Sequence, residues 1–247
     1  MKRPLVPVFL AGLVLSLAGC ATYLPPPPGA KADLQLFAPV GIQEGFAAKP
    51  TNPFPASIAA VRVQSPSYSS HYLRNHGGQY GDGRYSIITT REVEEQAQFD
   101  RLAALPQVSG LVALNRMLLP PRLEGDREIR EAAARLQADL VFLYTFDTAF
   151  FNTDAAKPLT VITLGLSPTR KISAVTTVSA LLLDTRTGYV YAAFEVTERD
   201  TMLSTSWGSS DSADEARRKT ERRAFGKLLD EVTTSWPKLL ERQARKG

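Results

Sequence analysis

Few residues in the chain have types and spacings that could do catalytic chemistry, and the first of these are its two histidines. His71 and His76 lie close in sequence to Asp82, and zinc and similar metals prefer imidazole and carboxylate ligands. The segment that holds them is rich in glycine, so we expect a loop without a helix or strand to aim the imidazoles at one ion. We therefore favour two exposed loop histidines and keep a metal-dependent periplasmic enzyme as a remote alternative.

The other motifs that resemble catalytic sequences lack essential parts. Trp207–Asp211 has neither the first glycine nor the preceding strand of a Gly-x-Ser-x-Gly nucleophile elbow. Asp184–Gly188 differs from the Asp-Thr-Gly of aspartic proteases because an arginine intervenes and no second copy follows, so it predicts a turn. The glycines at 77–83 precede a strand-like segment, whereas phosphate binding needs a helix start. We expect no enzyme activity, no metal and no cofactor.

The first nineteen residues have the three parts of a secretory signal. Lys2 and Arg3 form a short basic start, an apolar run extends from Leu5 to Ala18, and the small Gly19 comes before a cysteine. The apolar run is shorter than the roughly 20 residues that a helix needs to span a bilayer. We expect residues 1–19 to be a lipoprotein signal peptide that is removed.

Cys20 is the single cysteine of the chain and closes the sequence Leu17-Ala18-Gly19-Cys20. These residues match the bacterial lipobox, in which a leucine and two small residues direct the lipoprotein signal peptidase to cut before a lipidated cysteine. The match implies a diacylglycerol and an N-acyl chain such as palmitate on Cys20, which leaves no free thiol for catalysis and gives a nearly permanent membrane anchor. In the sorting pattern of such lipoproteins, an aspartate after the cysteine favours inner-membrane retention. Ala21 therefore predicts the outer membrane.

Pro25–Pro28 follow the cysteine and predict a stiff, extended spacer. We expect residues 20–55 to form the lipidated tether and an arm, and residues 56–247 to form a periplasmic domain. Without Lys2 and Arg3, 27 basic residues face 25 acidic ones, so the formal charge falls from +4 to +2. This small excess does not indicate a nucleic-acid partner. We expect membrane contact through the lipid anchor.

Periodicity and turn residues predict alternating strands and helices in the first part of the domain. Apolar runs of strand length indicate buried strands, and the residues Thr89–Glu92 have the spacing of a capping box that opens a helix. The segment 65–85 is rich in tyrosine and glycine and predicts a loop or an irregular hairpin. The expected order is strand 57–63, loop 65–85, helix 89–105, strand 108–119, a helix from 126 and strand 140–146.

The second part of the domain contains the clearest hairpin. Apolar and polar residues alternate before and after the segment Asp184–Gly188, where Gly188 can take the positive φ that a turn needs. A capping box at Ser212–Glu215 opens a C-terminal helix, which Pro237 should kink or restart. These elements predict an α/β fold with a single mixed sheet, helices packed on it, an antiparallel hairpin near 172–198 and a C-terminal helix.

The order of these elements and two short motifs resemble the α/β domain of several envelope proteins. Gln137–Val141 open a strand after a helix, and Leu183–Gly188 end a later strand before an aromatic return strand. This pattern is similar to that of the curli-secretion lipoprotein, the lipoprotein activators of penicillin-binding proteins and the N-terminal domain of the Tol-system propeller protein. The lipobox, Tyr144–Asp147 and the threonine-rich segment 160–177 also resemble the rhombotarget lipoproteins, although residues 242–247 lack the apolar processing tail of some members. Both resemblances imply noncatalytic envelope proteins.

The residues and the resemblances favour a lipoprotein that is anchored in the outer membrane, with its domain in the periplasm. We expect a noncatalytic binding or scaffold module that meets another envelope protein through an exposed sheet edge or the basic C-terminal helix. An oligomeric structural component of an envelope export or assembly complex is the alternative. In that case the partner is a second copy of the chain.

Overall fold

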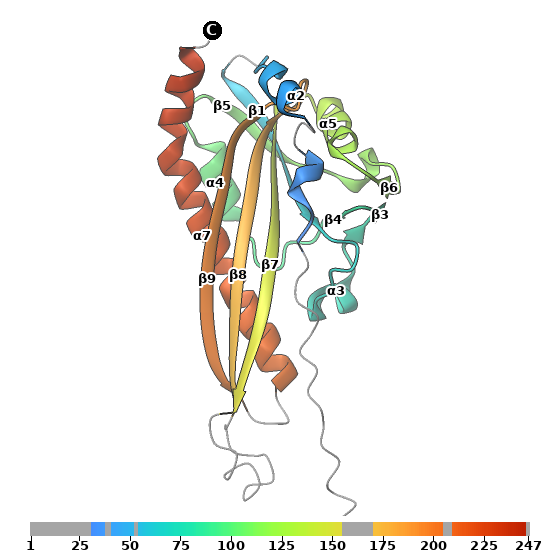
Figure 1. Ribbon diagram of the computed structural model, residues 1–247, viewed down its shortest axis with the longest axis vertical. Helices are drawn as coiled ribbons and strands as arrows, with labels where there is room; N and C mark the ends of the chain where they lie inside the picture. The colour runs from blue at the N-terminus through green and yellow to red at the C-terminus, as the bar shows by residue number, and fades with distance from the viewer. Residues whose placement is uncertain (1–30, 38–40, 52–53, 155–169, 205–208, 246–247) are drawn as a thin grey trace, which may run out of the picture.

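The computed structural model of the protein describes residues 31–37, 41–51, 54–154, 170–204 and 209–245. They form a mixed sheet of seven strands with helices on both faces (Figure 1), which confirms the expected α/β fold. The strands follow the order β2, β4, β1, β7, β8, β9, and β5 also pairs with β1. Their bounds are β1 (Ala56–Gln64), β2 (Gln79–Tyr80), β4 (Ser86–Ile88), β5 (Val108–Ala113), β7 (Leu140–Asp154), β8 (Arg170–Asp184) and β9 (Val190–Ser204). Outside this sheet, β3 (Asp82–Gly83) pairs with β6 (Arg122–Leu123).

The expected first strand is β1, and it lies in the centre of the sheet. β7 pairs with it in parallel along one edge. The other edge is shared, because β5 pairs in parallel with residues 56–60 and β4 pairs antiparallel with residues 62–64. β5 ends opposite Ala60 and β4 ends opposite Arg62, so both strands leave the edge of β1 near Val61. We call this point the fork.

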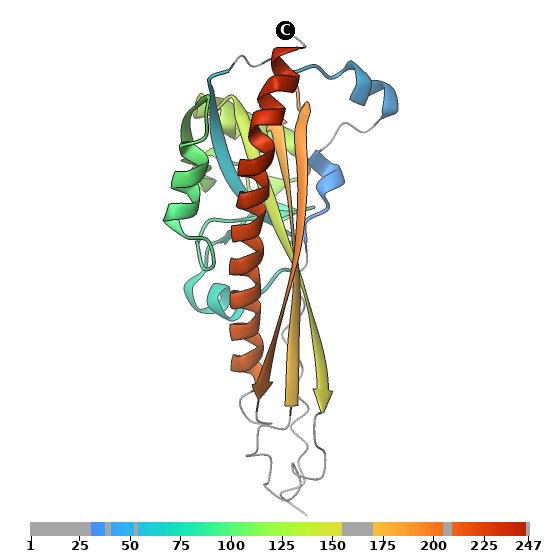
Figure 2. The ribbon, with the colours of Figure 1, turned by 90° about the vertical axis from the view of Figure 1, so that its left-hand side faces the viewer.

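β7, β8 and β9 form a long antiparallel blade that extends well beyond the other strands (Figures 1 and 2). Each of the three strands has 15 residues. β8 and β9 include the expected hairpin of 172–198 and extend it at both ends. β7 continues past the expected end at Phe146, because Thr148 remains buried and paired on the same face. The blade is therefore longer than its apolar segments indicate.

The two faces of the sheet bury two separate cores. α4 (Gln96–Ala103) and α7 (Ser209–Ala244) cover one face, where Phe142 and Phe146 of β7 lie in one cluster with Phe225. α5 (Asp126–Arg135) covers the other face together with η1 (Leu34–Phe37), and there Val141 and Leu143 pack. Alternate residues of β7 thus face opposite helices, as the pleat of a strand requires. Figure 2 shows α7 running along the whole blade.

The helix that we expected from Thr89 begins later, at Gln96. Its N-cap is Glu95, whose backbone N–H donates to the side chain of Gln98 over 2.7 Å. The hydroxyls of Thr89 and Thr90 instead donate to the carbonyls of residues 78 and 77, at 3.0 and 3.3 Å. The expected capping box is wrong because tertiary contacts use the threonine that would have supplied the cap.

The segment 65–85 is more ordered than a loop. It contains α3 (His71–His76), whose N-cap Ser70 accepts a hydrogen bond from the backbone of Leu73 over 3.1 Å. The strands β2 and β3 follow, and the intervening glycines have positive φ. The strand expected over 108–119 also ends early, because η2 (Arg116–Leu118) replaces its second half.

The C-terminal helix is longer than its sequence signals predict. α7 begins at Ser209, so the expected capping box at Ser212–Glu215 lies inside the helix. It also continues through Pro237 to Ala244 and does not restart there. Trp236 lies in the core beside this proline, and its indole N–H donates to the carbonyl of Pro106 over 2.8 Å.

Part of the expected arm packs on the sheet. The backbone N–H of Ala32 donates to Thr145 over 3.0 Å, and Phe37 is fully buried against Tyr85. At the other end of the arm, the N–H of Thr51 donates to the Asp184 carboxylate over 2.9 Å. Between these points lies α2 (Ile42–Ala47). In the ranges given above, no helix combines the length and the apolarity that a membrane span requires.

Candidate functional site

A buried network of charged side chains lies between β1 and α7, and Arg62 is its first centre. This arginine belongs to β1, and its side chain is 2% exposed. Its guanidinium pairs with Glu94 at 3.3 Å and with Glu221 at 3.9 Å, and it donates to the Tyr68 hydroxyl over 2.9 Å. It also stacks 4.5 Å above the Phe146 ring. The hydroxyl of Tyr144 donates to the same carboxylate of Glu94, so a tyrosine of β7 joins the network.

Arg217 of α7 is the second centre. It pairs with Glu221 at 2.8 Å, with Glu92 at 2.5 Å and with Asp214 at 3.0 Å. Glu221 also accepts from the hydroxyl of Thr148 of β7 over 3.1 Å. The network therefore connects β1, β7, the segment before α4 and α7 through charged groups that are almost completely buried.

Burial and neighbouring charges shift several pKa values in this network. Burial raises the pKa of Tyr68 to about 12, and the Glu221 carboxylate adds to the rise. Burial also raises the pKa of Glu92, although the Arg217 guanidinium acts in the opposite direction. Burial alone would lower the pKa of Arg62 and Arg217, but the groups around them, Tyr68 and the carboxylates, raise both. The tyrosine therefore stays neutral and both arginines stay charged at physiological pH.

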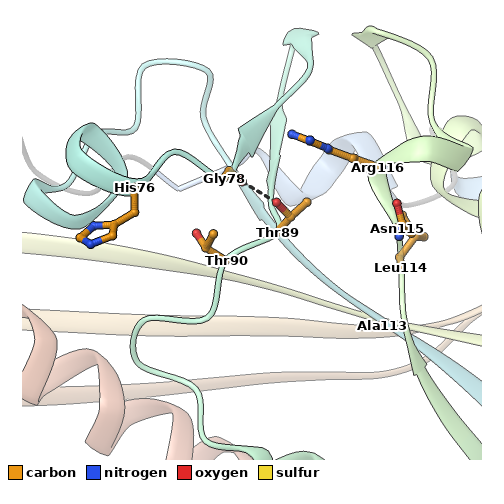
Figure 3. A pocket seen from close by; sticks show the side chains of 8 residues that line it. All are labelled: His76, Gly78, Thr89, Thr90, Ala113, Leu114, Asn115 and Arg116. Atoms are coloured by element: carbon orange, nitrogen blue, oxygen red, sulfur yellow. Dashed lines mark hydrogen bonds between the residues drawn. The ribbon is translucent and has the colours of Figure 1, made fainter.

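A surface pocket opens at the fork, next to this network. Its volume is about 490 Å³, and Figure 3 shows residues from three segments around it. α3 and the turn after it contribute one side, the segment after β4 contributes Thr89 and Thr90, and the segment after β5 contributes Asn115 and Arg116. We call it the fork pocket. It is lined by His76, Gly78, Thr89, Thr90, Ala113, Leu114, Asn115 and Arg116.

A small inner cavity of about 40 Å³ lies at the same fork. Thr89, Thr90 and Leu114 line both spaces, and Arg62 lines the inner one. The Nε atom of Arg62 is buried and has no hydrogen-bond partner among the residues described. Because an unpaired buried donor is costly, a hydrogen-bond acceptor at this N–H would stabilise the network.

A second surface pocket of about 450 Å³ adjoins α3. We call it the acidic pocket, and its lining residues are His71, Tyr72, His76, Glu92, Asp214 and Arg218. Its carboxylates, from Glu92 and Asp214, belong to the ionic network, and His76 lines the fork pocket as well. The two pockets thus meet at one imidazole. The Arg116 guanidinium lines one of them, and two carboxylates and the Arg218 guanidinium line the other.

The two histidines lie on α3 and not in a loop. His76 stacks on the Tyr72 ring with 4.3 Å between the centroids, and its Nδ1 lies 3.1 Å from the Tyr72 carbonyl oxygen. Both histidines are exposed, as expected. Asp82 is on β3, whose partner is β6. Within the described part of the chain there is no group of three or more histidine, cysteine, aspartate or glutamate side chains that could hold a metal ion.

The Asp184 turn has the expected form. The carboxylate accepts from the backbone N–H of Arg186 at 2.9 Å and of Thr187 at 3.0 Å, and Gly188 has a φ of 71°. Asp184 is fully buried and also accepts from the Tyr191 hydroxyl at 3.2 Å. Its contacts are those of a structural turn. The segment Trp207–Asp211 lies partly outside the described residues. The lipobox residues, with Cys20 and Ala21, lie entirely outside them.

The basic side chains of α7 are largely paired within the chain. Lys219 pairs with Asp200 at 3.0 Å, and both Arg223 and Lys227 pair with Glu198. Arg101 of α4 in turn pairs with Asp230 of α7 at 2.6 Å. The pairs of Lys219, Arg223 and Lys227 neutralise much of the positive charge that the sequence places on this helix.

Sequence reasoning missed the ionic network and both pockets. One signal was visible, since Arg62 interrupts the apolar sequence of β1. Its partners could not be named, because Glu94 and Glu221 come from distant segments that only the fold brings to β1.

No family model matches the chain, and no curated protein matches it. Among solved structures, it is similar to a neuraminyllactose-binding hemagglutinin homolog from Helicobacter pylori, with 12% identity and a TM-score of 0.33 over 81% of this chain and 96% of that one. It is also similar to a Xanthomonas campestris protein of the DUF330 family, with 10% identity and a TM-score of 0.32 over 80% and 95%. A third is the hypothetical protein CT253 from Chlamydia trachomatis, with 12% identity and a TM-score of 0.29 over 72% and 95%. All three are bacterial proteins. The resemblances found in the sequence stay predictions.

Proposed function

We propose that the protein is an outer-membrane-anchored periplasmic lipoprotein that acts as a noncatalytic binding module of the cell envelope. The sequence Leu17–Cys20 supports the anchor. The observation that carries the binding role is the meeting of the fork pocket and the acidic pocket at His76. Their polar linings suit a polar segment of an envelope protein, with an acceptor group near Arg116.

Three polar groups of the two pockets are already held by neighbours, which suits recognition. Glu92 and Asp214 are fixed by Arg217, and His76 is fixed by its stacking on Tyr72. Groups held in place bind a partner with a smaller loss of side-chain entropy than free groups do. The pockets thus offer a partly preorganised surface formed by α3, α7 and the segments after β4 and β5.

Photo-crosslinking in intact cells tests this role. A benzoylphenylalanine residue at Asn115 or His76 should give a discrete adduct with an envelope protein, whereas the same residue at Arg127 should give none. Arg127 is an exposed position on α5, away from both pockets. Asn115→Trp, which fills the fork pocket, should weaken the adduct formed from His76. Equal labelling from all three positions contradicts the proposed surface, and so does the absence of any adduct across growth conditions. Adducts between two copies of the chain favour the oligomeric alternative.

The anchor has its own test. Labelled palmitate should enter the wild-type protein and not the Cys20→Ala variant, which should also keep residues 1–19 and migrate as the larger precursor. Ala21→Asp should move the protein from the outer to the inner membrane in density fractionation. Palmitate labelling that survives Cys20→Ala would contradict the anchor.

A further inference from the structure

Two large apolar side chains of α2 are almost completely exposed. Ile42 is 83% exposed and Phe46 is 87% exposed. They are four residues apart and therefore lie on the same side of the helix. Figure 2 shows α2 standing out from the body of the domain. An isolated exposed apolar residue is ordinary, but a protruding pair on one helical face indicates a contact surface.

The position of α2 is fixed on both sides. Before it, Phe37 is buried in the core under the sheet. After it, the carbonyl of Lys49 accepts from the Thr187 hydroxyl at 2.9 Å, and Thr51 binds Asp184. The helix is therefore held beside the β8–β9 turn, and the exposure of its apolar face is a property of the fold.

The lipid surface that carries the anchor is within reach of this helix. Ala32 is hydrogen-bonded to Thr145 of β7. Thr145 lies five residues from Leu140, which is opposite Asp184 at the end of the sheet where α2 is held, so these two points of β7 are about 17 Å apart. The chain between Cys20 and Ala32 spans at most about 40 Å when fully extended. An anchor at Cys20 can therefore bring α2 to the membrane. This step rests on the proposed lipoprotein function.

The small size of the apolar face favours lipid over a protein partner. A stable protein interface buries about 800 Å² on each side, which is far more than two side chains of a six-residue helix supply. Insertion into a lipid interface has no such minimum area, because each buried apolar side chain adds its own binding free energy to that of an existing anchor. Glu44 is the only charged residue of α2.

We propose that Ile42 and Phe46 insert into the headgroup region of the membrane that carries the Cys20 anchor, and that they form a second membrane contact. This contact orients the domain, because α2 and the tip of the blade lie at opposite ends of the molecule (Figure 1). With α2 on the lipid, the blade points away from the membrane.

Tryptophan fluorescence with brominated lipids tests the contact in the acylated full-length protein. In phosphatidylethanolamine and phosphatidylglycerol vesicles, Phe46→Trp should add blue-shifted emission that brominated acyl chains quench, after subtraction of the wild-type signal. Phe151→Trp is the matched control, since Phe151 is 53% exposed on the blade. Its added emission should not be quenched. Unquenched emission from Phe46→Trp on membrane-bound protein overturns the proposal.

A second measurement separates this contact from the anchor. The mature Cys20→Ala chain, made without residues 1–19, should still bind the same vesicles weakly, and Ile42→Ser with Phe46→Ser should lower that partition coefficient at least about tenfold. Met117→Ser, at an apolar residue that is 82% exposed on η2, should leave it unchanged. If the acylation test fails but this difference remains, the anchor is wrong and the contact stands. If the serine variants instead convert a dimer to a monomer in light scattering, α2 binds a second copy and the proposal fails.

Discussion

Arg62 is a charged residue in the middle of an apolar strand, and it is as buried as its neighbours. Replacing it by methionine keeps the apolar stem and leaves Glu94 and Glu221 without one of their cations. Removing one partner of a buried ion pair costs about 3–5 kcal/mol, so we expect Arg62→Met to lower the free energy of unfolding by that amount in urea titrations. Arg127→Met breaks an exposed pair with Glu131 and should change little.

A double variant tests whether the charge is the cause. Arg62→Met combined with Glu94→Gln should be less destabilised than the sum of the two single variants, because the unpaired carboxylate is gone. If the two effects simply add, the destabilisation comes from lost packing on Phe146 and not from the buried charge.

Glu92 and Asp139 should respond to pH in opposite directions. Burial raises the pKa of Glu92 above its ordinary value of 4.5, so its contribution to stability is complete below that pH and is lost as the pH rises through the folded pKa. The free energy of unfolding of the wild type, minus that of Glu92→Gln, should thus be larger at about pH 4 than at about pH 7. Urea unfolding of both proteins at the two pH values checks this sign.

Asp139 provides the opposing case. Burial would raise its pKa, but hydrogen bonds from Ser57 and the Arg186 guanidinium lower it below its ordinary value of 3.8. Its contribution is therefore present above that value and lost as the pH falls through the folded pKa. The free energy of unfolding of the wild type, minus that of Asp139→Asn, should be larger at about pH 7 than at about pH 3. The same sign for both residues would contradict the assigned causes.

At the scale of elements, local signals predicted the β8–β9 hairpin, its turn and the start of α5, but misplaced the starts of α4 and α7. The alternation of β8 and β9 and the Asp184 turn depend on neighbours in sequence, and both are confirmed. The start of α4 was wrong because the Thr89 and Thr90 hydroxyls bind the turn after α3. A hydroxyl that can cap a helix can equally satisfy a distant carbonyl, and the sequence does not distinguish these uses.

The edge of β9 is covered in a way that its sequence does not predict. Arg223 of α7 donates to the backbone carbonyl of Arg199, and Arg242 donates to that of Tyr191, each at a distance of 2.5 Å. Because uncovered strand edges pair with other chains, we expect Arg223→Ser with Arg242→Ser to increase self-association in light scattering. Lys238→Ser removes a cation from the exposed side of the same helix and should have no such effect. An unchanged monomer fraction in the double arginine variant would show that the two contacts do not protect the edge.

At the scale of the whole molecule, the sequence predicted the α/β class but not which segments belong to the core. The proline-punctuated arm has no periodicity that could reveal a buried residue, yet Ala32 and Phe37 lie in the core beneath β1. The pockets were equally hidden, because α3, η2 and α7 are distant in sequence and meet only through the order of strands in the sheet. Long-range pairing, which local patterns do not encode, decides both features.

Two phenylalanines of the arm test whether it is part of the domain. Phe37 is fully buried and packs edge-on against Tyr85 at 4.9 Å, whereas Phe46 is 87% exposed. Phe37→Ala should lower the free energy of unfolding by about 3–5 kcal/mol, within a single transition, because it opens a cavity in the core of the whole domain. Phe46→Ala should change it by less than about 0.5 kcal/mol in the absence of membrane. Equal, small effects in chemical unfolding would mean that the arm is only a tether, whereas the expected contrast makes it an integral layer of the fold.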